Sequence, residues 1–162
     1  MRLDRYDILI LQILQQQGRI TKTDLAQAIN LSVSPCWERV KRLEKAGIIE
    51  GYGARINRQV LGKQTSVLVE ISLTSHSASR MQHFEKTMRE CEQVVDCYAT
   101  GGGVDYVLRI LCEGIDQYQR LIDHWLDADL GIDKYFTYIV TKTIKQTSSI
   151  PIEDSPGLLL SI

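Results

Sequence analysis

Charged and small polar side chains recur at helical spacing between residues 33 and 46, where the sequence reads VSPCWERVKRLEKA. At about 100° per residue, a helix here presents one polar side with two flanks. Lysine and arginine pair with phosphates or with guanine edges, and a glutamate accepts from a cytosine amino group. Backbone amides and hydroxyls at the helix start can hold a further phosphate. The pattern predicts a DNA-reading helix with these residues at its surface: Ser32, Ser34, Trp37, Glu38, Arg39, Lys41, Arg42 and Lys45.

A plainer interpretation fits the same pattern, because a charged helix face is often only solvated. Glu38 and Arg42 stand four residues apart and could pair with each other instead of with DNA. Under this alternative the chain is a ligand-binding or structural module whose N-terminal helices serve assembly. Replacing Arg39 and Arg42 by alanine separates the two interpretations, since a DNA-reading helix should then lose affinity for promoter DNA.

A second group of residues has the chemistry to bind a small zwitterion. Thr100, Gly101, Gly102 and Gly103 precede Asp105. Bare glycine backbone lets a ligand approach closely, and its amides can bind a carboxylate. Asp105 supplies the opposite charge for an α-amino group. The alternative is that the glycines only make a hairpin turn and that Asp105 is a solvated strand residue.

Catalytic constellations are missing from the sequence. The three histidines, His76, His83 and His124, have no carboxylate at a suggestive spacing, and no P-loop or HExxH motif is present. The four cysteines lack CxxC spacing and nearby histidines, which argues against a zinc site and a disulfide framework. We therefore expect no enzymatic activity, no metal and no cofactor, and a reducing, cytoplasmic location.

Three capped helices would position the cationic face. Asp4 with Asp7, and Thr21 with Asp24, have the spacing of a capping box before an apolar repeat. The predicted helices cover residues 4–16, 22–29 and 33–46, and the tight turn between the last two is that of a helix-turn-helix. The apolar segment 48–57 is interpreted as a small wing or linking strand that leads into a hinge near residues 57–63.

In the second half of the chain, the spacing of apolar residues alternates between that of strands and that of helices. Strand alternation occurs at residues 66–74, 94–100, 104–112 and 134–145, and helical spacing at 78–91 and 115–127. This β-α-β-β-α-β order is the ferredoxin-like arrangement, so the predicted class is α+β. The two helices cover one face of such a sheet, and a second copy of the chain is the simplest cover for the other face. The predicted domains are residues 1–61 and 62–162.

Charge is distributed unevenly over these two predicted domains. Residues 1–61 hold 10 Lys and Arg against 6 Asp and Glu, whereas residues 62–162 hold 9 against 14. A basic part joined to an acidic part is typical of a nucleic-acid reader fused to another module. The apolar runs are too short to span a bilayer, so we expect no membrane partner.

Several long motifs resemble the Lrp/AsnC family, the leucine-responsive and asparagine-synthase regulators. The resemblance runs from about Leu3 to Pro151. It is carried by LDRYDILIL, GRITKTDLAQAINLSVSPCWERVKRLEKAGIIEGY, VLVEISL, GGGVDYVLRI and FTYIVTKTIK. It implies a winged helix-turn-helix whose reading element runs from Lys22 to Lys41, which adds Lys22 to the predicted DNA contacts. It also implies a ferredoxin-like domain that senses ligands and mediates oligomerisation.

The resemblance further implies which partners the chain has. Members of the family bind double-stranded DNA, form dimers through the sheet and often octamers arranged as a ring of dimers, and bind an amino-acid effector in clefts between neighbouring dimers. The positions that match the family's effector-response residues are Ala99, Asp105, Ile115, Tyr138, Ile139 and Val140. One departure stands at Gly103-Val104, where the family commonly has an acidic residue and then an aromatic one. This smaller, less charged lip is expected either to change which amino-acid side chain is accepted or to weaken amino-acid binding altogether.

Overall fold

The computed structural model describes residues 2–57, 60, 62 and 64–152. The chain divides into two compact units, Met1–Arg55 with Lys145–Ile162, and Ile56–Ile144. The sequence places the domain boundary between residues 61 and 62 and a hinge near residues 57–63. Residues 58–59, 61 and 63 lie outside the described part of the chain, so both assignments stay predictions.

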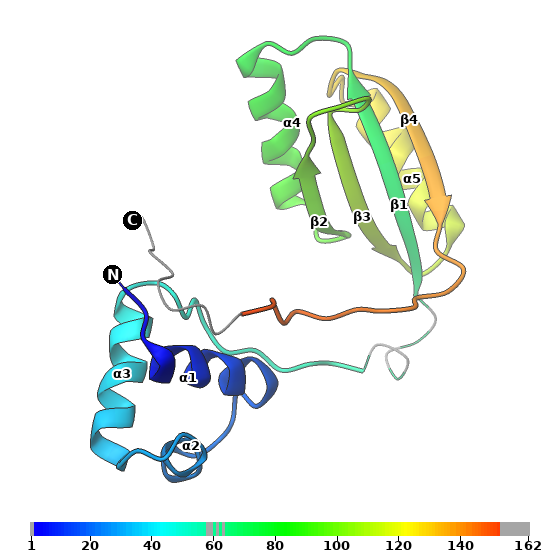
Figure 1. Cartoon of the computed structure of the whole chain (residues 1–162). Helices are drawn as coiled ribbons and strands as arrows, with labels where there is room; N and C mark the ends of the chain where they lie inside the picture. Colours follow the sequence, from blue (N-terminus) through cyan, green and yellow to red (C-terminus); the bar gives the residue numbers. More distant parts are fainter. Residues whose placement is uncertain (1, 58–59, 61, 63, 153–162) are drawn as a thin grey trace. The chain divides into compact units, whose positions relative to one another are not determined.

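The first unit is built on three helices, drawn in blue and cyan in Figure 1: α1 (Arg5–Gln16), α2 (Lys22–Ala28) and α3 (Val33–Lys45). They confirm the predicted helices to within one residue at each end. Cys36, Val40 and Leu43 form the buried face of α3, as helical spacing predicts. They pack against apolar residues of the other two helices and their flanks: Leu3, Ile8, Ile10, Leu11, Leu25, Ala26 and Ile29.

A residue in the left-handed conformation follows α2, and another follows α3. Asn30 has a φ of 55° and donates its amide to the carbonyl of Gln27 at 3.1 Å, while the amide of Leu31 donates to Ala26 at 2.9 Å. This is a Schellman motif with asparagine in the position usually held by glycine. Gly47, with a φ of 68°, takes the same position after α3. The turn between α2 and α3 is therefore fixed by backbone bonds.

Residues 48–57 form no strand in the structure, contrary to the linking strand predicted for them. A strand requires backbone bonds to a neighbouring strand. The amides of Ile48 and Ile49 instead donate to the carbonyl of Leu43, at 3.0 and 3.3 Å, and both side chains pack against the core of the three helices. Their apolar pattern reflects this packing.

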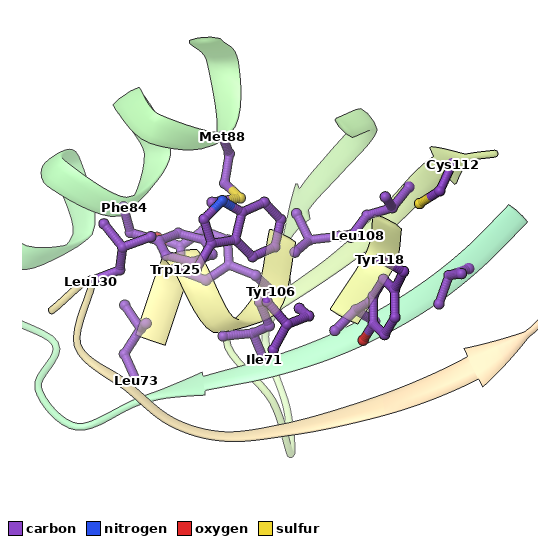
Figure 2. Packing of buried hydrophobic residues seen from close by; sticks show 14 residues of the cluster. Ile71, Leu73, Phe84, Met88, Tyr106, Leu108, Cys112, Tyr118, Trp125 and Leu130 are labelled. Carbon is purple, nitrogen blue, oxygen red and sulfur yellow. The ribbon is translucent and has the colours of Figure 1, made fainter. Parts of the chain in front are cut away.

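The second unit is a four-stranded antiparallel sheet with two helices. Its elements are β1 (Thr65–Leu73), α4 (Ala78–Glu90), β2 (Val94–Ala99), β3 (Tyr106–Cys112), α5 (Ile115–Asp127) and β4 (Ile132–Ile139), with strand order β2-β3-β1-β4. This confirms the predicted βαββαβ arrangement. Both helices cover one face of the sheet. Figure 2 shows Phe84 and Met88 of α4 and Trp125 of α5 gathered against the strand residue Tyr106.

β4 is shorter than the predicted strand over residues 134–145. It ends at Ile139, and the last ladder contacts pair Ile139 with Val67 and join the amide of Val140 to the carbonyl of Ser66 at 2.9 Å. Because β1 begins at Thr65, the residues after Val140 have no strand left beside them. The β-branched run alone does not show where the neighbouring strand starts.

The face of the sheet opposite the helices carries large exposed side chains. Leu68 on β1 stands opposite Tyr138 on β4, and Glu70 stands opposite Phe136. Leu68, Phe136 and Tyr138 are 38%, 54% and 49% exposed. Tyr98 on β2 is on the same face, because its partner Val107 also pairs with Glu70. We call this the open face; it has an apolar and aromatic surface that the described residues leave exposed.

The tail after Lys145 belongs to the helical unit and not to the sheet. The side-chain amide of Gln12 donates to the carbonyl of Ile152 at 2.9 Å. Gln15 accepts from the amide of Ile150 at 2.7 Å and donates to its carbonyl at 3.3 Å. The side chain of Ile152 packs against the core of the three helices. The sequence assigned these residues to the second domain.

The described residues contain neither a membrane-spanning helix nor a metal-binding cluster. No helix among them is both long and apolar enough to cross a membrane. No cluster of three or more histidine, cysteine or acidic side chains within that part of the chain could hold a metal ion.

Candidate DNA-binding surface and effector residues

The outward face of α3 is formed by Ser34, Glu38, Lys41 and Lys45, all of which are exposed. Their spacing of four, three and four residues places them in one row along the helix. Within the described part of the chain, none of these four side chains makes a hydrogen bond or an ion pair. The row therefore has two ammonium groups, one carboxylate and one hydroxyl available for an external partner.

The start of α3 also leaves polar groups available. Ser32 is the N-cap residue, but its side chain makes no hydrogen bond to the helix. Ser32 and Ser34 are both exposed, and the first-turn amides of a helix point towards its N-terminal end. Together they have the donors needed to hold a phosphate group.

Lys22 and Trp37 lie against each other. The Lys22 ammonium is 3.9 Å from the centre of the Trp37 ring, a cation–π contact between the start of α2 and the first turns of α3. Trp37 is half-buried and packs against the helical core, so it holds the lysine beside α3. The structure therefore places two of the predicted contact residues together.

Arg39 and Arg42 point towards α1, which the sequence did not predict. Arg39 donates to Asp4 at 2.6 Å and to Asp7 at 2.9 Å. One Arg42 Nη atom lies 2.7 Å from both carboxylate oxygens of Asp7. A helical wheel gives the direction of each Cα–Cβ bond, but the long arginine side chains turn back to the neighbouring helix. Asp7, a charged residue within the apolar LDRYDILIL stretch, was the sequence signal for this pairing.

Electrostatics in this cluster follow from the contacts. Burial alone would raise the pKa of Asp4, but hydrogen bonds from Arg39 and from the amides of Asp7 and Tyr6 outweigh it and lower that pKa. Burial opposes the charged form of Arg39, and its bonds to Asp4 and Asp7 raise its pKa overall. Both groups are held in their ionised forms.

The predicted effector residues fall into two groups at opposite ends of the sheet. We call residues 99–105 the hairpin group: Ala99 ends β2, and the amide of Asp105 donates to the carbonyl of Ile71 at 2.9 Å. We call Ile115, Tyr138, Ile139 and Val140 the β4-end group; Ile139 stands opposite Val67 on β1. Val67 and Ile71 are four residues apart, about 14 Å along an antiparallel strand. One chain does not bring the two groups together.

Asp105 already has partners within its own chain. One carboxylate oxygen accepts from the amide of Leu73 at 2.7 Å, and the other is 2.8 Å from Nε2 of His76. The sequence predicted no carboxylate partner for His76, because the two residues are 29 positions apart and meet only in the folded sheet. Part of the Asp105 carboxylate remains accessible, since the side chain is 23% exposed.

The three glycines of the hairpin group have open space around them. A Cβ added to Gly101, Gly102 or Gly103 would meet no atom within 4 Å. Packing within the chain therefore does not require glycine at these positions. A separate hollow of about 420 Å³ lies between α4 and β2, and Ala99 is the one predicted effector residue among those that line it.

Comparison with known proteins finds a family match for each of the two units. Residues 3–50 match the family model of a winged helix-turn-helix DNA-binding domain, and residues 66–150 match that of the Lrp/AsnC ligand-binding domain. The transcriptional regulatory protein DoeX of Halomonas elongata is 60% identical over 155 residues, 95% of this chain and 98% of that protein. The leucine-responsive regulatory protein of Haemophilus influenzae is 35% identical over 151 residues, 93% of this chain and 91% of that protein.

Solved structures give the same result. A transcriptional regulator from Neisseria meningitidis, solved as a complex with L-Met, aligns with a TM-score of 0.86 and 31% identity over 92% of this chain and 96% of that one. An AsnC family transcriptional regulator from Agrobacterium tumefaciens aligns with a TM-score of 0.87 and 31% identity over 92% and 97%.

Proposed function

Because the chain belongs to the Lrp/AsnC family of DNA-binding transcriptional regulators, we propose that it reads DNA through the outward face of α3. Residues 3–50 match a DNA-binding domain and the curated relatives are regulatory proteins, so the alternative in which the N-terminal helices serve assembly is set aside. A DNA-bound regulator works where the DNA is, and in a bacterium this is the cytoplasm.

The observation that carries the DNA-binding proposal is the row of unengaged side chains on α3. Lys41 and Lys45 are free to neutralise phosphates, and Ser32 and Ser34 with the first-turn amides can hold another. Glu38 lies between them and can accept from a cytosine amino group. Lys22, held on Trp37, adds a further cation beside the helix. Lysines therefore supply affinity here, and Glu38 contributes to sequence preference.

The salt dependence of DNA binding tests this role. We expect Lys41→Ala with Lys45→Ala to weaken binding to the upstream DNA of the protein's own gene. The slope of log K against log salt should fall by about 0.9 for each phosphate that the variant no longer neutralises. Fluorescence anisotropy between about 50 and 200 mM salt measures both quantities. Lys86→Ala, an exposed lysine of α4, is the matched control. Unchanged affinity and slope in the double variant would contradict the proposal.

The ligand of the second unit is proposed to be an amino acid that contacts two chains. The hairpin group offers glycine amides for a carboxylate and Asp105 for an ammonium, while the β4-end group offers apolar surface from Ile139. A ligand that touches both groups needs one from each of two chains, because they lie about 14 Å apart along the sheet of one chain. The L-Met bound in the Neisseria relative supports an amino acid as the ligand class.

A mixing experiment tests the shared site. Thermal shift with the standard amino acids first identifies a ligand, since binding to the folded state raises the unfolding temperature. Asp105→Asn and Ile139→Asp should each abolish the shift, whereas Asp123→Asn, on the exposed side of α5, should not. Mixed oligomers of the two inactive variants should regain part of the binding, because some sites then combine two intact halves. A site within one chain predicts no recovery.

A further inference from the structure

Asp7 is completely buried, although it carries a charge. Its side chain is 0% exposed on α1, next to the core residues Ile8 and Ile10. A buried carboxylate is costly unless it is paired and fully hydrogen-bonded. Its two oxygens accept from Arg39 at 2.9 Å, from Arg42 at 2.7 Å and from the amide of Asp4 at 3.1 Å. The folded unit therefore depends on both arginines at this point.

The cluster joins two helices through four charges that balance. Asp4 and Asp7 stand three residues apart at the start of α1, and Arg39 and Arg42 stand three apart in the second half of α3. Arg39 bridges both carboxylates, and its guanidinium lies 5.3 Å from the centre of the Tyr6 ring. Arg42 spans both oxygens of Asp7. Each helix thus contributes two groups one turn apart.

This geometry constrains rotation in a way that the apolar contacts do not. Cys36, Val40 and Leu43 bury the inner face of α3, but burial of apolar surface is non-directional. Each guanidinium binds here through one Nη atom that lies between two carboxylate oxygens, and these charged bonds fix the position of that atom relative to α1. A small rotation of α3 about its axis would break these bonds before it exposed the apolar face. It would also turn the outward row, including Lys41, relative to DNA.

We infer that Arg39 and Arg42 are positioning residues for DNA recognition, which set the rotation of α3 through the buried carboxylate of Asp7 and do not contact DNA themselves. The inference rests on the proposed DNA-reading role of α3. If Arg42 bound a phosphate instead, both oxygens of the buried Asp7 would lose a charged donor. The alanine pair at these two arginines is therefore an ambiguous test of DNA contact, because it also removes the support of the helix.

The test compares Asp7→Asn, Arg42→Gln and their double variant in the full chain, at a temperature where circular dichroism shows each to be folded. If the cluster positions α3, each single variant should weaken binding to specific DNA about tenfold or more. The slope of log K against log salt should stay unchanged. The double variant should bind no more weakly than the worse single variant, because both act through one contact. Arg89→Gln, an exposed arginine of α4 paired with Glu85, is the matched control and should bind normally.

Other outcomes overturn the inference. If Arg42 contacts DNA, Arg42→Gln should lower the salt slope by about 0.9 while Asp7→Asn binds normally. If the cluster serves stability alone, all variants should unfold at lower temperature yet bind DNA with normal affinity when folded. Should Asp7→Asn fail to fold, Arg39→Gln replaces it, because Asp7 then keeps Arg42. Unchanged DNA binding of the variant with Lys41→Ala and Lys45→Ala would instead contradict the proposed function itself.

Discussion

At the scale of single residues, the same charge type has two different roles on one helix. The lysines of α3 are unengaged and exposed, whereas Arg39 and Arg42 are tied to α1. Arginine suits the second role because its guanidinium is always charged and is more weakly hydrated than an ammonium, and lysine suits the first as a solvated point charge. Counting cations on a helical wheel therefore overestimates the number that have no partner within the chain.

Asp4 should give the helical unit a pH dependence. Because the folded-state pKa of Asp4 is lowered, its contribution to stability is present above its ordinary value of 3.8 and is lost as the pH falls through the folded-state pKa. Asparagine is an equally good helix cap, so Asp4→Asn removes mainly the ionic part. We expect the variant to be less stable at neutral pH, with the difference shrinking below about pH 4.

Urea unfolding of both proteins across this pH range, followed by circular dichroism, measures the difference in the free energy of unfolding. The carboxylates that do not share a partner with Asp4 are common to both proteins, and their contributions cancel in the comparison; Asp7 is the exception, because it shares Arg39 with Asp4. A difference that stays constant down to acidic pH would show that Arg39 does not stabilise the ionised form of Asp4.

At the scale of elements, local signals predicted the helices and strands well. Capping residues such as Asp4 and Thr21 and the periodicity of apolar residues placed the first three helices to within one residue at each end, because these are properties of neighbouring positions. Two predictions about strands were wrong: β4 ends at Ile139 instead of residue 145, and residues 48–57 form no strand. Both depend on a neighbouring strand that is distant in sequence. The contact of His76 with Asp105 was missed for the same reason.

The tail from Lys145 to Ile152 is the element for which the sequence had no signal. Ile152 packs against the helical core, so Ile152→Ala should destabilise that unit by about 1–2 kcal/mol, less than for a fully buried isoleucine. Ile144→Ala is the matched control, because Ile144 is 82% exposed and its replacement should leave the free energy of unfolding unchanged. Urea unfolding measures both. Equal stabilities of the two variants would mean that the tail contact contributes nothing.

At the scale of the whole molecule, the open face of the sheet is where we propose that two copies pack. The face exposes Leu68, Phe136 and Tyr138, and an apolar surface of this kind is typical of a self-association site. Phe136→Glu should place a charge in that interface and reduce the mass seen by light scattering. Leu126→Glu alters an apolar residue on the exterior of α5 and should leave the dimer intact. A normal dimer in Phe136→Glu would exclude this face.

The proposed sharing of the ligand site between two chains concerns the part of the site that the sequence could not locate. Each predicted residue was placed on a definite element, but the hairpin group and the β4-end group lie at opposite ends of one sheet. A sequence describes one chain, and its spacing carries no distance between residues of two chains. The proposed DNA-reading face differs in this respect, because residues of one chain, on α3 and at the start of α2, present it.

The most direct test of the account is the structure of the protein bound to the upstream DNA of its own gene. We predict α3 in the major groove, with Lys41 and Lys45 at phosphates, Glu38 at base edges, and Arg39 and Arg42 still bound to Asp7. A complex in which the outward face of α3 points away from DNA would contradict the DNA-reading role. One in which Arg42 leaves Asp7 for a phosphate would contradict its role as a positioning residue.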